Sequence, residues 1–319
     1  MKRIIICVIA LAIAACLQAT GPKVNKVKGI VRPDYLCKGD SVGIMTVSSP
    51  VESSRGKADS LIALVESWGL KVRLGENLFK REAGAFTVSD KERGEELQRM
   101  IDNDNLKAII FYRGGYGAIR TLDYVDFTRL KKHPKWIVGF SDLTTYLSIF
   151  CNMKLESIHG GMLTSYSLTN PDDIDTKGGA GTNPYNRCGS VEGVIAGGNM
   201  TLLSIAMGTP DDLKIRDNTI LFIEEVDESM STVDRFMQQL LRSGKLDKIK
   251  GLIIGNFTRP KEEDYWGESV YDLLNSYTKE MKIPVLYGLK SGHGKINHSI
   301  YMGRYIKLTV TPEGGEIVF

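Results

Sequence analysis

The stretch that decides the fold is Lys135-Trp136-Ile137-Val138-Gly139-Phe140-Ser141-Asp142-Leu143-Thr144. Its apolar residues predict a buried strand over 136–140, and the polar turn predicts a helix over 142–152. A serine on such a turn projects its hydroxyl at the carboxyl edge of a sheet, close to free helical N–H groups. Ser141 is therefore a candidate nucleophile. The alternative stays open that Ser141 or Asp142 only caps the helix, and the second glycine of G-x-S-x-G is absent.

Strand and helix patterns also alternate toward the N-terminus. The apolar runs and helical periodicities follow one another along 41–47, 57–68, 71–74, 89–102 and 106–112. Elements that alternate at this spacing form a parallel sheet covered by helices on both faces. We therefore expect an α/β fold, with a doubly wound N-terminal domain over residues 36–166 that carries the candidate nucleophile.

The composition changes after about residue 165. Residues 167–189 are rich in Asn, Asp, Pro, Gly and Thr, which is typical of a linker or a surface loop. Beyond them the sequence shows short strand patterns and one clear helix, over 231–241. These patterns predict a second, β-rich domain over residues 190–319.

Composition and charge set outer limits on function. The 319 residues are 42% hydrophobic and 25% charged, as in an ordinary globular protein. The net charge is +3, of which Lys2 and Arg3 supply two, so the charge of the chain does not predict a nucleic-acid partner. Three of the five cysteines lie beyond the first twenty residues and show no C-x-x-C spacing, so neither a zinc site nor a redox pair is indicated.

The first twenty residues predict a signal peptide. Met1-Lys2-Arg3 precedes an apolar run over 4–15 that is too short to span a bilayer comfortably, and small residues follow it. The run Ile13-Ala14-Ala15-Cys16 is similar to a bacterial lipobox, in which a lipidated Cys16 would anchor the chain to a membrane. Simple cleavage near Ala19 is the alternative. Both interpretations predict export to the periplasm or the cell envelope.

A glycine-rich segment, Arg113-Gly114-Gly115-Tyr116-Gly117, directly follows the strand predicted over 106–112. Glycines there let backbone N–H groups approach a ligand closely, as a phosphate cradle or as an oxyanion donor beside Ser141. The segment is neither a G-x-G-x-x-G motif nor a P-loop, so a nucleotide site is poorly supported. A tight turn without a ligand stays open. Arg113 is either a two-point binder of a substrate carboxylate or a surface charge.

An acid and a histidine complete the candidate chemistry. Glu224 ends an apolar strand pattern over 220–223, where it could orient a histidine. Composition cannot choose between it and its acidic neighbours, which are Glu225, Asp227 and Glu228. His293 lies between two glycines, and imidazole has the near-neutral pKa that a general base needs. His159, before two glycines, fits either a pocket edge or a hydrogen-bonded structural role, and no histidine pair shows metal-ligand spacing.

Six markers in one order carry a resemblance that covers nearly all of the chain after the signal. The sequence resembles the L,D-carboxypeptidases of the LdcA/MccF type, the S66 serine peptidases. The markers are Arg113-Gly114-Gly115-Tyr116-Gly117, Gly139-Phe140-Ser141-Asp142-Leu143-Thr144, Ile158-His159-Gly160, Gly197-Gly198-Asn199, Leu221-Phe222-Ile223-Glu224-Glu225 and Ser291-Gly292-His293-Gly294. Two departures are mild: Gly161 replaces a common proline, and Glu225 replaces a common aspartate.

The resemblance implies a role for each site residue. It maps the nucleophile onto Ser141, the acid onto Glu224 and the base onto His293. It further implies backbone oxyanion donors at Gly115 and Asp142. We add three substrate-binding candidates, which are Arg113, Gly114 and His159. The implied fold is the α/β domain with the serine and a barrel-like C-terminal domain with the acid and base.

The resemblance also implies an activity. Members remove the terminal D-alanine from the peptidoglycan tetrapeptide, and others act on peptide-nucleotide antibiotics. It implies no metal or cofactor, peptidoglycan-derived peptides as partners, and a homodimer. Its best-known members are cytoplasmic, whereas the signal predicted here favours the cell envelope. An exported muropeptide-binding lipoprotein with little catalysis is the alternative.

Overall fold

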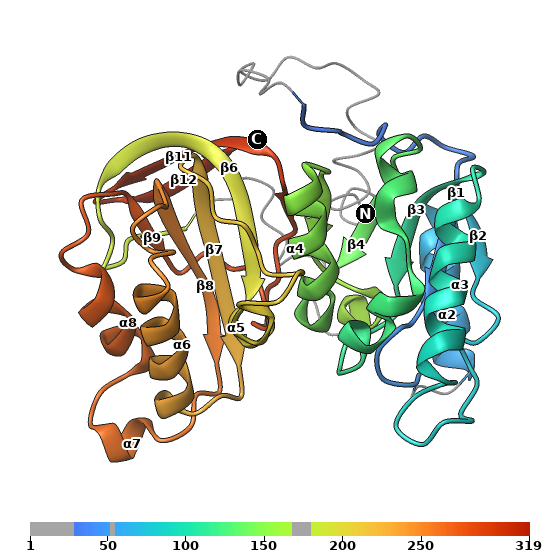
Figure 1. Ribbon diagram of the computed structural model, residues 1–319, viewed down its shortest axis with the longest axis horizontal. Coiled ribbons are helices and arrows are strands. Elements are labelled where there is room, and N and C mark those ends of the chain that lie inside the picture. Colours follow the sequence, from blue (N-terminus) through green and yellow to red (C-terminus); the bar gives the residue numbers. More distant parts are fainter. Residues whose placement is uncertain (1–28, 52–54, 168–179) are drawn as a thin grey trace.

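The computed structural model describes residues 29–51, 55–167 and 180–319, which form two sheets with their helices (Figure 1). The predicted signal over 1–20, with Cys16, lies outside the described residues, as does 168–179 of the predicted linker. Among the described residues, no helix combines the length and apolar character needed to cross a bilayer. Within the described residues, Cys37, Cys151 and Cys188 form no disulfide, and Cys151 is buried in the core.

The first sheet has six strands in the order β10-β5-β4-β3-β1-β2. All its neighbouring strands run parallel except β10 and β5, which pair antiparallel. The strand bounds are β1 (Ser41–Met45), β2 (Lys71–Leu74), β3 (Leu106–Phe111), β4 (Trp136–Gly139), β5 (Ser157–His159) and β10 (Ile300–Met302). The helices are α2 (Arg55–Ser67), α3 (Asp90–Asp102), α4 (Thr144–Met153), and the 3-10 turns η1 (Ala118–Tyr124), η2 (Phe127–Lys131), η3 (Ser141–Leu143) and η4 (Leu163–Ser167).

Alternate residues of β3 show that this sheet is covered on both faces. Ala108 and Ile110 belong to the core cluster that contains the buried side of α2. Ile109 and Phe111 belong to the other cluster, with the buried sides of α3 and α4. Successive strand side chains point to opposite faces, so a parallel strand buried on both sides reads as an unbroken apolar run. The prediction of a doubly wound α/β domain is confirmed.

The second sheet has the order β12-β11-β6-β7-β8-β9, with β6 to β9 parallel and β11 and β12 antiparallel. Its strands are β6 (Gly189–Asn199), β7 (Thr219–Val226), β8 (Gly251–Thr258), β9 (Val285–Tyr287), β11 (Tyr305–Thr311) and β12 (Gly314–Val318). Besides the predicted helix, α6 (Met230–Arg242), it carries α5 (Met200–Ala206), α7 (Glu263–Trp266) and α8 (Val270–Thr278), so this domain holds more helix than its sequence pattern predicts.

The barrel-like character expected of this domain is limited to a partial closure. In the described residues its hydrogen-bonded ladder is an open sheet that ends at β9 and β12. Two isolated bridges, Ala180 with Gly315 and Arg187 with Val285, let one segment touch both edge strands. The glycine at position 315 of β12 allows the two edge strands to come close, because a Cβ there would overlap the side chain of Leu286 on β9.

The two domains share one interior. Strand β10 lies near the end of the sequence, yet it pairs with β5 of the first sheet. Next to it, the buried Arg304 donates two hydrogen bonds to Glu156 at 2.8 and 2.6 Å, and Arg32 donates to the same carboxylate. In Figure 1, α4 of the first domain stands beside β6 of the second. This junction fixes the carboxyl ends of both sheets relative to each other.

Candidate active site

Ser141 sits on a sharp turn at the carboxyl end of β4. Its φ of 61° is left-handed, which is uncommon for a residue with a side chain and is typical of strained functional turns. Gly139 permits the turn, because a Cβ there would come within 2.9 Å of Leu143 Cγ. The Ser141 side chain caps neither η3 nor α4. The capping alternative for Ser141 is therefore wrong, and its hydroxyl is available for another partner.

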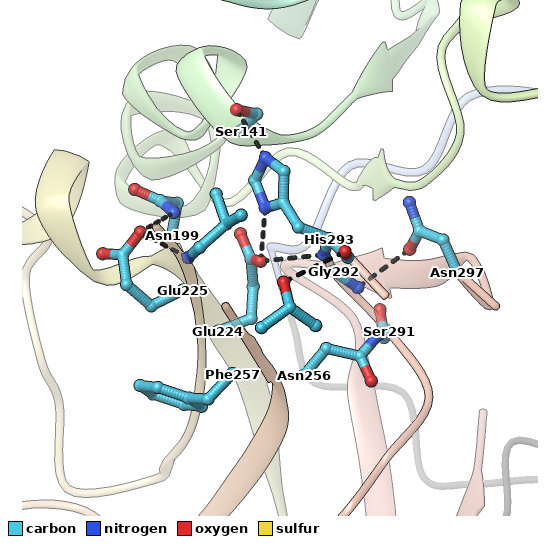
Figure 2. A network of polar contacts seen from close by, with 12 residues as sticks. Ser141, Asn199, Glu224, Glu225, Asn256, Phe257, Ser291, Gly292, His293 and Asn297 are labelled. Atoms are coloured by element: carbon cyan, nitrogen blue, oxygen red, sulfur yellow. Dashed lines mark hydrogen bonds and ion pairs between the residues drawn. The ribbon is translucent and has the colours of Figure 1, made fainter. Parts of the chain in front are cut away.

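That partner is His293, which comes from the other domain. Ser141 Oγ lies 2.9 Å from Nε2 of His293, and Nδ1 of the same ring lies 2.7 Å from Oε2 of Glu224 (Figure 2). The backbone N–H of His293 donates a second hydrogen bond to Oε2 at 3.1 Å. Glu224 is fully buried and the His293 side chain is 18% exposed. Three side chains that are far apart in sequence thus form one hydrogen-bonded row.

The structure decides between the neighbouring acids. Glu225 points away from His293 and accepts a hydrogen bond from Asn199 Nδ2 at 2.7 Å (Figure 2). It also accepts one from Thr201 N at 2.8 Å. It therefore anchors the start of α5. Asp227 pairs with Arg259 at 2.6 Å on the surface. Successive residues of β7 face opposite sides, so Glu224 alone of these three faces the imidazole.

The loop that carries His293 is shaped by Gly292. Gly292 has a φ of +107°, and a Cβ there would overlap the carboxylate of Glu224. Its N–H donates to Asn297 Oδ1 at 2.9 Å, and Thr258 Oγ1 donates to the His293 carbonyl at 3.1 Å. The loop packs directly onto the carboxylate, and only glycine allows this approach.

We predict that Gly292→Ala lowers kcat/KM by about 100-fold, because the new methyl group displaces Glu224 from His293 and small misplacements are costly. Steady-state kinetics and thermal unfolding measure the effect. Gly267→Ala is the matched control: Gly267 is also left-handed, at +69°, but no atom lies within 4 Å of the added Cβ. Equal activity losses in both variants would contradict the steric explanation.

Two opposing effects act on His293. Burial by itself lowers its pKa, but the charge of Glu224 and the hydrogen bond donated to that carboxylate outweigh burial. The net result is a pKa raised above the ordinary value of 6.5. A base must be neutral to accept a proton, so the raised pKa moves the active form to higher pH.

We predict that kcat/KM rises with pH and reaches half of its maximum above pH 6.5, where His293 loses its proton. The raised pKa of His293 also contributes to the free energy of unfolding. This contribution is complete below pH 6.5 and is lost as the pH rises through the raised pKa. Kinetics at several pH values, with circular dichroism as a check on folding, measure both. A half-maximum well below pH 6.5 contradicts the assignment of His293 as the base.

The glycine-rich segment lies against the serine turn. A Cβ on Gly114 would be 3.4 Å from Ser141 Cβ, and a Cβ on Gly115, whose φ is +120°, would overlap Ser49 Oγ. Among the described residues, no backbone carbonyl outside the helices and strands accepts a hydrogen bond from the N–H of Gly115 or of Asp142. The oxyanion role of both amides stays a prediction.

Side chains beside the segment hold it in place. The carboxylate of Asp142, 1% exposed, accepts hydrogen bonds from Ser48 Oγ at 2.5 Å and from Ala118 N at 2.8 Å. Burial raises the pKa of Asp142, and these two hydrogen bonds oppose the rise. Arg113 donates to the Pro50 carbonyl at 2.9 Å and so braces the loop after β1. Substrate binding by Arg113 and Gly114 stays a prediction.

His159 is buried next to the candidate active site. It ends β5, its side chain is 0% exposed, and its Nε2 lies 4.0 Å from Oε1 of Glu224. Substrate binding by His159 stays a prediction. The position of His159 before two glycines marks it as a residue of the site. How deeply its side chain is buried depends on the pairing of β5 with β4 and β10, which the sequence pattern does not reveal. Among the described residues, no cluster of His, Cys, Asp and Glu could hold a metal ion.

An α/β fold with a hydroxyl, an imidazole and a carboxylate in one hydrogen-bonded row has the arrangement found in hydrolases with a serine nucleophile. Comparison with known proteins gives the family. Residues 42–160 match the LD-carboxypeptidase N-terminal domain, and residues 192–308 match the LD-carboxypeptidase C-terminal domain. The chain belongs to the LD-carboxypeptidase family.

Relatives and a solved structure agree with this assignment. The chain is 32% identical over 283 residues to the "Probable murein peptide carboxypeptidase" of Bacillus subtilis, covering 82% of this chain and 86% of that protein. It is 29% identical to the murein tetrapeptide carboxypeptidase of Pseudomonas aeruginosa, covering 81% and 89%. The crystal structure of muramoyltetrapeptide carboxypeptidase from Oxalobacter formigenes is similar with a TM-score of 0.74 at 26% identity, covering 87% and 97%.

Proposed function

We propose that the protein is a serine carboxypeptidase that removes the terminal D-alanine from peptidoglycan tetrapeptides, by cleaving the bond between an L-centre and D-alanine. The observation that carries this proposal is the 2.9 Å contact between Ser141 Oγ and His293 Nε2. Murein peptides are named as substrates for similar proteins of B. subtilis and P. aeruginosa, which supports the substrate class.

In the proposed first half-reaction, His293 takes the proton of Ser141 as the Ser141 oxygen attacks the carbonyl before D-alanine. Glu224 orients the imidazole and stabilises its charged form. The N–H groups of Gly115 and Asp142 hold the oxyanion, each contributing about 3 kcal/mol of transition-state stabilisation. His293 then gives its proton to the D-alanine nitrogen, and the C–N bond breaks to leave an ester on Ser141.

In the second half-reaction, water attacks the ester carbonyl and gives a proton to His293. The ester bond breaks, the tripeptide leaves, and the proton returns to Ser141. Every proton is therefore carried by a residue whose position is described, and no cofactor takes part in the proposed steps.

Mass spectrometry of purified tetrapeptide after incubation with the protein tests the proposal. The expected product is the tripeptide together with free D-alanine. Binding of tetrapeptide without turnover favours the muropeptide-binding alternative, and turnover of peptide-nucleotides alone contradicts the substrate class. A tetrapeptide that ends in L-alanine is the control for stereochemistry and should stay intact.

The place of action and the assembly are further proposals. Lys2, Arg3 and the apolar run support export to the periplasm or the cell envelope, and Cys16 supports a lipid anchor. Mass spectrometry of the mature N-terminus distinguishes a lipidated Cys16 from cleavage near Ala19. Light scattering tests the predicted homodimer.

A further inference from the structure

His159 and Glu224 face each other in the interior, with one side chain from each sheet. His159 Nε2 lies 4.0 Å from Glu224 Oε1, and both side chains are 0% exposed. Among the described residues, neither ring nitrogen of His159 has a hydrogen-bond partner, and neither has Glu224 Oε1. Buried polar atoms normally find partners, so two unsatisfied groups that face each other point to a functional pair.

The two oxygens of Glu224 are used unequally. Oε2 accepts hydrogen bonds from the side-chain and backbone N–H groups of His293, at 2.7 and 3.1 Å. Oε1 accepts none within the described chain. The terminal torsion of a glutamate is broad and roughly two-fold, so bonds to Oε2 alone hold the plane of the carboxylate loosely. A contact at Oε1 would fix that plane.

The pairing of strands places His159 for such a contact. Gly139, two residues before Ser141, lies opposite His159 in the β4–β5 register. The ring of His159 packs edge-on against Phe222, with centroids 5.0 Å apart, and against Phe140 at 5.7 Å. The strand pair that positions the serine therefore also holds an imidazole against the far oxygen of the acid.

We propose that His159 is a positioning residue, which directs its Nε2–H at Glu224 Oε1 and so keeps Oε2 aligned with His293. Burial lowers the pKa of His159 to about 4, so the ring is neutral near pH 7 and acts as a dipole. The titratable groups that act on it are Glu224 and His293. The 4.0 Å separation is about 1 Å beyond a hydrogen bond, and catalytic hydrogen bonds often tighten only when substrate binds.

The inference rests on the proposed function, and four variants test it: His159→Phe, His159→Leu, His159→Gln and Ser157→Ala. Phe and Leu remove the N–H, whereas Gln places an amide nitrogen near the position of Nε2. Ser157 is also buried on β5, with its hydroxyl unpaired among the described residues, so Ser157→Ala is the matched control. For each variant we would measure kcat, KM and the melting temperature.

We expect His159→Phe and His159→Leu to lower kcat by about 10-fold with little change in KM, because the N–H that would fix the plane of the Glu224 carboxylate is lost. His159→Gln should recover most of the loss, and Ser157→Ala should match the wild type. The low-field proton resonance of His293 Nδ1–H should weaken or shift only in the Phe and Leu variants. Wild-type kcat in both apolar variants, or losses that Gln does not recover, overturn the inference.

A second readout separates this inference from the proposed substrate. A fluorophosphonate labels an activated serine whatever the natural substrate is. Its rate of reaction with Ser141 therefore measures how strongly His293 and Glu224 activate the serine. If the wild type is labelled but does not cleave tetrapeptide, the substrate proposal fails and the labelling rates of the His159 variants still decide. If the wild type is not labelled at any pH, the nucleophile and the role of His159 fail together.

Discussion

Replacing Ser141 with alanine should lower kcat/KM for D-alanine release by at least about 10⁴-fold. The hydroxyl is the only group of the hydrogen-bonded row that can form the ester, and it lies 2.9 Å from its proposed base. The oxyanion donors and the binding surface stay in place, so a small residual rate over water is expected. Liquid chromatography of released D-alanine, with long incubations, measures the difference.

The fold should survive this change. Alanine keeps the Cβ and removes a single oxygen, so the melting temperature should stay close to that of the wild type. Ser60→Ala, an exposed substitution on α2, is the control for handling and should retain full activity. Turnover by Ser141→Ala at the wild-type rate would remove the nucleophile assignment and, with it, the acyl-enzyme.

Replacing Glu224 with glutamine should lower kcat by roughly 10⁴-fold. An amide at this position can favour the wrong tautomer of His293, with the proton on Nε2 where Ser141 has to deliver its own. It also removes the negative charge that stabilises the imidazolium. The burial of Glu224 strengthens this effect, since solvent reaches only the His293 side chain and screens the pair weakly. KM should change little, because Glu224 is buried behind the imidazole.

Glu225→Gln is the matched comparison, one residue away on the opposite face of β7. Glu225 accepts hydrogen bonds from Asn199, Thr201 and Val226, so an amide turned toward these donors should cost about 1–3 kcal/mol of stability. Its kcat should stay within a few-fold of wild type. Thermal melts and kinetics on both variants decide the matter: if Glu225→Gln loses as much turnover as Glu224→Gln, the assignment of the acid is wrong.

Much of the first domain was predictable from local sequence, because its strands are buried on both faces and read as unbroken apolar runs. The serine turn was predictable for the same reason, since Gly139 and Ser141 follow such a run directly. Helices α5 and α8 are harder to predict because each is short, with seven and nine residues, so each offers few turns over which a helical period can be recognised.

The choice between Glu224 and Glu225 could not be made from composition, since both are acidic and both are buried. It depends on which face of β7 meets the loop of Gly292, and the pairing with β8 shifts register between Ile223 and Glu225. The position of His159 is likewise a long-range property. It depends on β10, whose residues are about 140 positions later in the chain and carry no sign of their partner.

The separation of 152 positions between Ser141 and His293 has a consequence for biosynthesis. The ribosome makes the serine first, and the chain then carries an ordinary, unactivated hydroxyl until the imidazole emerges. The outer edge of β5 also stays unpaired until β10 has been synthesised. A copy that ends before His293 lacks the proposed base, so its Ser141 should remain as unreactive as a serine on any protein surface.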